Sequence, residues 1–255
     1  MNKKILSISS KVGIKLLSGC ILSLMIANTV IAAYTPPKKP SRPRSPVASG
    51  GTRGGCSQNP QASLTALAPI SHNGKTVSTQ PKFAWFVPDT KSYPMELSLY
   101  EYNTDDSLKK IKSFDFPSQS GIMSFSISQD KYSLSVGKKY LWQIALRCDT
   151  NSPSKDIFVE AEIEVVPMPN NLANQISQIT NSIQKARIYG KEGFWYDALS
   201  ETLKSPQNQE FKLTLLEQLS DLEAKEATII SDNNIKVNLQ NQSSHLQKIV
   251  EIERQ

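Results

Sequence analysis

Asp197 and Glu201 have the spacing in this sequence that comes nearest to a catalytic pair. Residues four apart share one face of a helix, and two carboxyls on one face could act as acid and base in glycan cleavage. The same spacing is common on helix faces that meet only water, and we favour that interpretation. The pair is still the basis of a hydrolase hypothesis.

The two histidines beyond the N-terminal segment are weaker candidates for a catalytic site. His72 lies beside the turn signal Asn73-Gly74, and His245 lies in a polar stretch near the C-terminus. A Ser-His-Asp site needs a histidine that a rigid frame holds in place, and we expect neither position to provide one. The sequence also has no glycine-rich phosphate loop and no metal-ligand spacing. It therefore predicts no catalytic residue, no cofactor and no metal.

Cys56 follows two glycines, so a cysteine nucleophile is conceivable, but a disulfide between Cys56 and Cys148 is the better interpretation. Exported chains keep few exposed free thiols. The bridge would close a loop of about 92 residues, for which chain entropy gives an upper figure of about 4–5 kcal/mol. The alternative is two unpaired thiols, one of them buried.

Three consecutive aromatics, Phe194, Trp195 and Tyr196, precede Asp197. Successive helix positions point in different directions, so we expect that the three rings cannot all face one core. Docking of the helix onto the predicted sandwich is the favoured explanation. The alternative is a contact with a protein partner or a glycan, since aromatics are enriched at such contacts. Phe194, Trp195, Tyr196 and Asp197 are thus the candidate partner contact.

The N-terminus predicts export. Residues 1–33 have a basic start, an apolar core from Ile21 and small residues at Ala32 and Ala33, which is the order of a secretory signal peptide. Cleavage after Ala32 and cleavage after Ala33 are both acceptable, and an uncleaved anchor is a third possibility. Cys20 ends a lipoprotein-like box, but the apolar core begins after it, so a lipid anchor is the lesser alternative. We expect a periplasmic, envelope or extracellular protein.

Residues 34–55 form a basic, proline-rich linker, expected to be extended. Residues 1–55 hold nine of the 29 Lys and Arg and no Asp or Glu, so residues 56–255 keep 20 basic against 23 acidic side chains, a net charge of −3. This argues against nucleic-acid binding, which needs clustered cations on a folded face. Membrane contact is expected only through the signal segment or weakly through the linker.

Residues 56–168 carry the period-two pattern of about seven short strands with no helix between them. We predict an antiparallel β-sandwich of the immunoglobulin or fibronectin type. The turn at Gly137 before Tyr140 resembles the tyrosine corner of such sandwiches, in which the hydroxyl bonds the preceding loop.

The period changes to 3.6 after Pro169. Residues 169–230 predict a helical domain: a first helix over 172–188, a second over 194–203 that makes a tetratricopeptide-like hairpin with it, and a third from Phe211. Residues 231–255 are a polar tail, which we predict to be partly disordered, with a weak helical extension as the alternative. The chain is therefore predicted to be mainly β with a helical C-terminal part.

Five blocks occur in a recognisable order: GTRGGC at 51–56, LTAL at 64–67, TVSTQPKFAWFVP at 76–88, YLWQIALRCD at 140–149 and GFWYDAL at 193–199. Together, behind a signal peptide, they resemble the secreted cyanobacterial family known as domain of unknown function 928. The resemblance covers about residues 51–205. It implies an envelope protein without an established activity, so no functional residue is carried over. Ala161-Glu162 departs from the glycine and aromatic that we expect in the last strand, which puts the pairing of that strand in doubt.

These observations favour an exported, non-enzymatic module of the cell envelope. Its partner would be an envelope protein that docks on the sandwich and helical hairpin. The alternative partner is a wall glycan bound by an exposed tryptophan or tyrosine, and the least favoured hypothesis is a glycan hydrolase.

Overall fold

Alternating apolar residues form the strands of this protein, as period-two patterns predict. The computed structural model describes residues 32–38, 40–43, 56, 62–127, 132–149 and 153–255. Within these, the strands are β1 (Thr65–Ala66), β2 (Gly74–Thr76), β3 (Lys82–Val87), β4 (Pro94–Tyr102), β5 (Leu108–Pro117), β6 (Gly121–Ser126), β7 (Lys139–Leu146) and β8 (Ile157–Val165). The predicted signal segment up to Ile31, including Cys20, and linker residues 44–55 lie outside the described residues.

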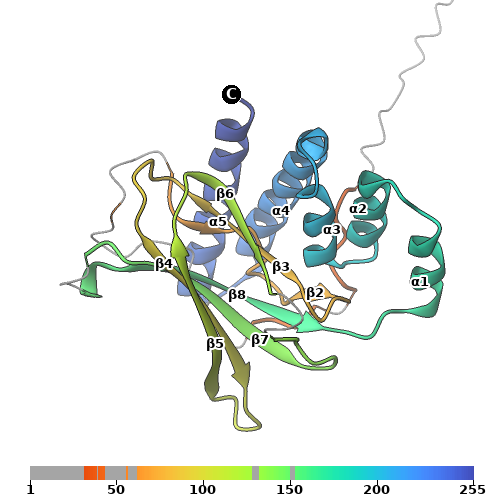
Figure 1. Ribbon diagram of the computed structural model, residues 1–255, viewed down its shortest axis with the longest axis horizontal. Helices are drawn as coiled ribbons and strands as arrows, with labels where there is room; N and C mark the ends of the chain where they lie inside the picture. The colour runs from red at the N-terminus through yellow and green to blue at the C-terminus, as the bar shows by residue number, and fades with distance from the viewer. Residues whose placement is uncertain (1–31, 39, 44–55, 57–61, 128–131, 150–152) are drawn as a thin grey trace, which may run out of the picture. The chain divides into compact units, whose positions relative to one another are not determined.

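The strands form two sheets (Figure 1), one with the order β1-β3-β6 and one with the order β2-β8-β7-β4-β5. Neighbouring strands are antiparallel except for β2, which runs parallel to β8. The prediction of a wholly antiparallel sandwich is therefore wrong at this edge. The Asn73-Gly74 pair, which predicted a turn, instead leads into β2. Strand β8 pairs with β7 from Ile157 to Glu164 without a register shift, so the Ala161-Glu162 departure does not disturb the pairing.

Side chains from the two sheets meet in a shared core. The rings of Phe83 on β3 and Trp142 on β7 lie 5.4 Å apart, and those of Phe114 on β5 and Phe125 on β6 lie 4.8 Å apart. Residues 83–87 of β3 are all buried, although a strand alternates its faces. Both faces of this central strand are therefore covered.

The turn before β7 matches its prediction. Gly137 adopts a φ of +85°, a conformation that glycine reaches without strain. The Tyr140 hydroxyl accepts a hydrogen bond from the backbone N–H of Ser135 at 2.9 Å. The tyrosine thus fastens the preceding loop, as the sequence motif predicts.

Helices follow the strands: α1 (Asn170–Ser177), α2 (Ser182–Lys191), α3 (Trp195–Thr202), α4 (Gln209–Ile229) and α5 (Asn233–Glu253), with short 3₁₀ turns η1 (Pro153–Lys155) and η2 (Pro206–Asn208). The single helix predicted over 172–188 is divided into α1 and α2. Asn181 explains the division, because its side chain caps α2 by accepting from the N–H of Gln184 at 2.9 Å.

The C-terminal tail is a helix, so the prediction of partial disorder is wrong. Helix α5 buries Leu239, Leu246, Ile249 and Val250 on one stripe and packs along α4. The many Asn and Gln residues around these four positions lower the mean hydropathy without interrupting the stripe. Asp232 caps the helix by accepting from the N–H groups of Asn234 and Ile235.

The boundary expected near residue 168 separates strands from helices but does not separate two cores. One buried cluster joins Trp142 of β7, Tyr196 of α3, Leu216 of α4 and Leu246 of α5. Ala32–Gln255 accordingly forms one compact unit. No helix of the described residues is long and apolar enough to cross a membrane.

Candidate functional site

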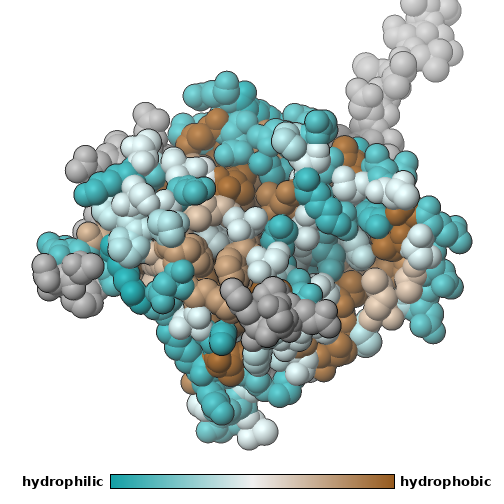
Figure 2. All heavy atoms as spheres, in the orientation of Figure 1, coloured by the Kyte–Doolittle hydropathy of each residue, from teal (hydrophilic) through white to brown (hydrophobic). Residues whose placement is uncertain are grey.

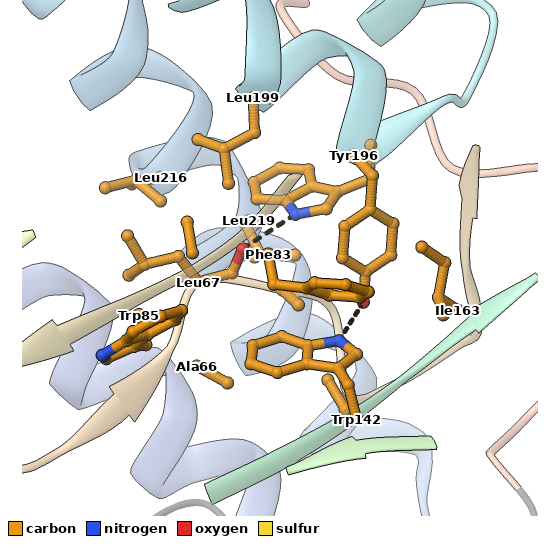
Figure 3. Packing of buried hydrophobic residues seen from close by; sticks show 14 of the residues in the cluster. Ala66, Leu67, Phe83, Trp85, Trp142, Ile163, Tyr196, Leu199, Leu216 and Leu219 are labelled. Carbon is orange, nitrogen blue, oxygen red and sulfur yellow. Dashed lines mark hydrogen bonds between the residues drawn. The ribbon is translucent and has the colours of Figure 1, made fainter. Parts of the chain in front are cut away.

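The aromatic block of α3 fastens the helices to the β-sheets. The Trp195 indole N–H donates to the Leu67 carbonyl at 2.9 Å. The Tyr196 hydroxyl accepts from the Trp142 indole N–H at 2.7 Å and donates to the Glu162 carbonyl at 3.0 Å. Figure 3 shows the rings of Tyr196 and Trp142 between the helices and the strands. Each polar group of the two rings thus has a partner inside the protein.

The candidate partner contact is therefore buried. Phe194, Trp195, Tyr196 and Asp197 are all less than 9% exposed. The prediction of an exposed ring assumed that only one side of the helix faces a core. In the structure, α3 contacts the strands, α4 and α2. Phe194 packs against Tyr189 of α2. The tryptophans Trp85, Trp142 and Trp195 are 0% exposed, so a glycan contact through tryptophan has no surface on which to form.

Asp197 and Glu201 do not lie on a solvated helix face, which corrects that interpretation. The Asp197 carboxylate accepts hydrogen bonds from the Val77 N–H at 3.0 Å and from the Thr76 hydroxyl at 3.2 Å. It thus pairs with backbone just beyond β2, at the edge of the five-stranded sheet. Burial raises the pKa of Asp197 to about 7. Glu201 is also buried and pairs with Lys204 at 2.7 Å.

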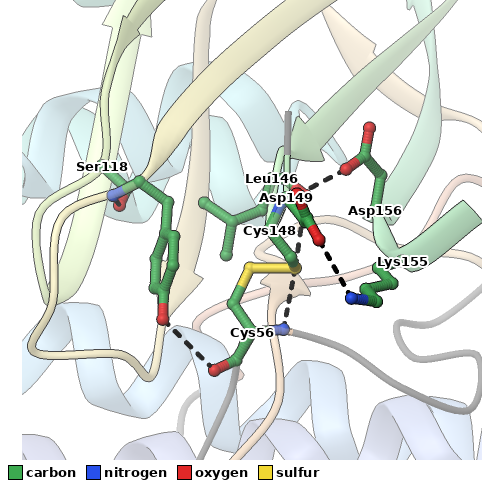
Figure 4. The surroundings of a disulfide bond; sticks show 8 residues. Cys56, Ser118, Leu146, Cys148, Asp149, Lys155 and Asp156 are labelled. Atoms are coloured by element: carbon green, nitrogen blue, oxygen red, sulfur yellow. Dashed lines mark hydrogen bonds and ion pairs between the residues drawn. A yellow bond between two sulfur atoms is a disulfide. The ribbon is translucent and has the colours of Figure 1, made fainter. Parts of the chain in front are cut away.

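Cys56 and Cys148 form the predicted disulfide, with their sulfurs bonded at 2.02 Å (Figure 4). The Cys148 N–H donates to Asp156 at 3.2 Å, and the hydroxyl of Tyr93 lies 3.5 Å from the Cys56 carbonyl. The bridge joins the chain ahead of β1 to the end of β7. A bonded sulfur cannot attack a substrate, so a Cys56 nucleophile is excluded while the bridge is intact.

His72 is more rigidly held than its neighbourhood in the sequence suggests. Its Nε2 lies 2.7 Å from the Tyr34 hydroxyl and its Nδ1 lies 2.9 Å from the Ser71 hydroxyl. Burial lowers the pKa of His72 to about 4, so the ring is neutral near pH 7. Glu223 lies next to this pair and accepts from the N–H groups of Ile70 and Ser71. The polar groups of His72 and Glu223 therefore bind other parts of the same chain.

An open recess of about 710 Å³ lies where two turns meet at one end of the five-stranded sheet. Its lining is Glu101, Tyr102, Asn103, Thr104, Asp105, Asp106, Gly137, Lys138 and Lys139. In Figure 2 hydrophilic side chains gather over the turn between β4 and β5, at the bottom of the view. The recess combines carboxylates, an amide, ammonium groups and one aromatic ring.

Both turns that form the recess are internally bonded. The Asn103 N–H donates to the Ser107 carbonyl at 2.8 Å, and the Asp106 N–H donates to the Asn103 carbonyl at 3.1 Å. Asp106 has a φ of +62°, which Asp and Asn tolerate better than most residues. On the other side Gly137 donates to the Val165 carbonyl at 2.7 Å, and Lys138 pairs with Glu101 across the gap.

Sequence reasoning missed the recess, although both of its turns have local signals. Gly137 precedes the predicted corner tyrosine, and residues 103–106 contain one Asn and two Asp, which favour turns. The two turns are more than 30 residues apart in the chain. Only the pairing of Glu101 with Tyr140 across β4 and β7 brings them together, and neither turn carries a signal for that register.

Among the described residues, no cluster of three or more His, Cys, Asp or Glu could hold a metal ion. The recess has three acidic side chains, but Glu101 is paired with Lys138 and Asp105 accepts from Ser107. These hydrogen bonds lower the pKa of Asp105. The recess is therefore suited to a ligand that offers both donors and acceptors.

Comparisons with known proteins agree with the five sequence blocks. No curated protein matches the chain. Astrotactin-2, described as a conserved, vertebrate-specific, perforin-like membrane protein, is 12% identical with a TM-score of 0.27, over 77% of this chain and 39% of that chain. A structure named pT26-6p is 11% identical with a TM-score of 0.22, over 75% of this chain and 47% of that chain. The chain thus spans less than half of either structure.

Likenesses at such TM-scores carry no argument about fold or function. The family described as Domain of Unknown Function (DUF928) matches residues 48–228. This range includes the five blocks, the disulfide and the aromatic block of α3, and it spans more than half of the chain. The protein therefore belongs to the DUF928 family.

Proposed function

We propose that this protein is an exported, non-enzymatic binding module of the cell envelope, and that its recess binds a glycan. The observation that carries the proposal is the lining of the recess. Sugar hydroxyls donate and accept hydrogen bonds, and the recess offers acceptors at Asp105 and Asp106 and donors at Lys138 and Lys139. The Tyr102 ring supplies an apolar face for a sugar ring.

We favour a binding role over hydrolysis because the carboxyl groups with strongly raised pKa values lie outside the recess. Asp197 and Glu223, the two carboxyls whose pKa is raised to about 7, accept hydrogen bonds from the chain's own N–H groups. Neither lines the recess. A general acid must reach the glycosidic oxygen, and these two side chains are buried among helices and strands.

The export part of the proposal is supported by the signal-like N-terminus and by the disulfide, which persists in oxidising compartments. We place the protein in the periplasm, the envelope or outside the cell, in keeping with the cyanobacterial family that it resembles. We also assign the sheets to the immunoglobulin or fibronectin type, supported by the Tyr140 contact. Buried Ala186, Tyr189 and Ala198 support a single tetratricopeptide-like hairpin of α2 and α3.

Sedimentation of the exported protein with isolated wall sacculi, and its affinity for soluble envelope polysaccharides, test the glycan role. Thr104 is exposed in the recess, so Thr104→Arg should fill the space and weaken binding at least about tenfold, the equivalent of about 1.4 kcal/mol. Thr228→Arg is the matched control, because Thr228 is exposed on α4 and outside the recess.

The proposal fails if the unaltered protein binds no glycan, or if Thr228→Arg weakens binding as much as Thr104→Arg. Turnover of a glycan by the purified protein would contradict the non-enzymatic part. Thermal unfolding of both variants should match that of the parent protein, since exposed positions away from packing change stability by about 0.5 kcal/mol or less.

A protein-docking role is the second candidate. Ile229 is 66% exposed and Val237 is 50% exposed, on the two sides of the turn between α4 and α5. An envelope protein with an apolar face would suit this turn. Crosslinked capture from envelope extracts should then depend on Ile229, and Ile229→Ser should abolish capture of one specific protein. Equal capture by both forms would remove this candidate.

A further inference from the structure

Residues 33–38, which we call the N-terminal strap, are packed into the folded body although they belong to a segment expected to be an extended linker. Ala33 is 2% exposed and Tyr34 is 4% exposed. The backbone N–H groups of Ala33 and Tyr34 donate to the Gln218 side-chain oxygen at 2.6 and 2.9 Å. The Thr35 N–H donates to the Gly190 carbonyl at 2.9 Å.

The end of α2 is shaped to receive the strap. A Cβ atom at Gly190 would lie 2.0 Å from the Ala33 carbonyl oxygen, closer than any side chain permits. Gly193 has a φ of +84°, and a Cβ there would lie 3.2 Å from the Thr35 carbonyl oxygen. The Tyr34 ring packs edge-on against Trp195, with centroids 5.0 Å apart. The strap and the two glycines are therefore parts of one fitted contact.

We infer that the chain is processed between Ala32 and Ala33, and that the new α-ammonium group of Ala33 docks on Gln218. This inference rests on the proposed export. Ala32 is exposed, the compact unit begins at this residue, and small residues at this position suit a signal-peptide cleavage site. The Gln218 oxygen, which accepts the Ala33 N–H, would accept from the ammonium group.

The structure distinguishes this cut from the one after Ala33, which the sequence alone allows. Removal of Ala33 would empty the space against Gly190 and create a charged terminus at the Tyr34 nitrogen. Either cut leaves its charged terminus on a buried residue, because Ala33 is 2% and Tyr34 is 4% exposed, so the packing of Ala33 against Gly190 is what separates the two cuts. Cleavage before Ala33 keeps the packing and places the charge next to the exposed position of Ala32.

The reaction is hydrolysis of one peptide bond by a signal peptidase. The C–N bond breaks, the water oxygen leaves Ala32 with a carboxylate, and both protons of the water end on the Ala33 nitrogen, which becomes an ammonium group. In the folded protein, the residue before this bond is exposed and the residue after it is buried. A protease binds its substrate as an extended chain on both sides of the bond that it cleaves. Processing therefore precedes docking of the strap, and precursor that has already folded should resist cleavage here.

The chain from Met1, expressed in a bacterial host that has its own secretion pathway and signal peptidase, gives the first test. Intact mass and N-terminal sequencing should show a chain that begins at Ala33. A chain that begins at Tyr34 would overturn the strap assignment and leave export standing. A protein that is found outside the cytoplasm but keeps Met1 would overturn the processing, and a cytoplasmic protein that keeps Met1 would overturn the proposed export as well.

A variant at the receiving residue gives the second test. In a chain that begins at Ala33, Gln218→Glu would place a carboxylate beside the ammonium group and raise the pKa of the α-amino group, measured by pH-dependent reductive methylation. The new ion pair should also raise the thermal stability of this chain. The same substitution should give no gain in a chain that is N-acetylated at Ala33, because that chain carries no ammonium group. An α-amino group that titrates identically in the parent and Gln218→Glu chains would overturn the docking.

Discussion

Two regions of the molecule use the same kinds of side chain in different ways. One is the contact of α3 with the β-sheets, and the other is the recess at the end of the five-stranded sheet. Glu162 belongs to both surroundings: Tyr196 donates to its carbonyl and Tyr102 donates to its carboxylate. Around Tyr196 every neighbour is another part of the chain. Tyr102, by contrast, is only half-buried and lines the open recess.

The difference shows that residue type alone does not mark a binding site. The aromatic block of α3 is more conspicuous in the sequence than Tyr102 and its turn, yet its hydrogen-bonding groups are already used. Buried polar groups that are fully paired hold a fold together. Polar groups that face an open recess on firm turns keep capacity for a ligand.

Trp195→Ala should have the greatest effect on stability. It removes a fully buried indole and leaves the Leu67 carbonyl without its donor, so the free energy of unfolding should fall by about 3–5 kcal/mol. Chemical denaturation followed by circular dichroism measures this. A change below about 1 kcal/mol would mean that α3 is not a fixed part of the core.

Replacement of both Cys56 and Cys148 by serine should lower the free energy of unfolding by about 2–4 kcal/mol. The bridge lies beyond the C-terminal end of β7 and the recess lies at its N-terminal end. Binding at the recess should therefore persist in the variant at temperatures where it stays folded. The parent protein must also lose about two protons' mass relative to its reduced form, and equal masses would contradict the bridge.

Asp197→Asn should flatten the dependence of stability on pH. Burial raises the pKa of Asp197 to about 7 in the folded protein, from an ordinary value of 3.8. The folded state therefore keeps a proton that the unfolded state releases, and this stabilisation is lost as pH rises from about 4 to about 7. The slope is at most about 1.4 kcal/mol per pH unit for one proton.

Two other buried groups titrate in the same window and provide the controls for this experiment. Burial raises the pKa of Glu223 to about 7, so its stabilising effect is also lost as the pH rises. Burial lowers the pKa of His72 to about 4, so the unfolded state binds a proton at a higher pH than the folded state does, and stability rises with pH. Glu223→Gln should thus flatten the curve as Asp197→Asn does, whereas His72→Gln should steepen the fall. Unchanged slopes in all three variants would refute the buried titrations.

Asp106→Asn should leave stability within about 0.5 kcal/mol of the parent protein, because Asn tolerates the positive φ of this position. If the recess binds a glycan through its carboxylates, the same variant should still weaken binding. Calorimetric titration with the glycan checks the affinity, and thermal unfolding checks the fold. A loss of several kcal/mol in stability would show that the recess is structural, as the α3 contact is.

Local patterns were sufficient for several parts of this protein. The alternation in 83–87 and 140–146 predicts β3 and β7, and Gly137 before Tyr140 predicts the hydroxyl contact with the loop. An even number of cysteines beyond the predicted signal segment predicts the disulfide. Such signals depend on a residue's near neighbours or on chemistry that needs no exact position, so they can be read along the chain.

Other features depend on which distant segment covers each surface. The burial of Trp195, the raised pKa of Asp197 and the order in α5 all arise from packing between parts of the chain that lie far apart. The recess needs the register of β4 against β7, and the strap needs Gly190 and Gln218. A linear pattern records whether a residue is apolar or charged, but the partner that desolvates or pairs with it is set by the tertiary fold.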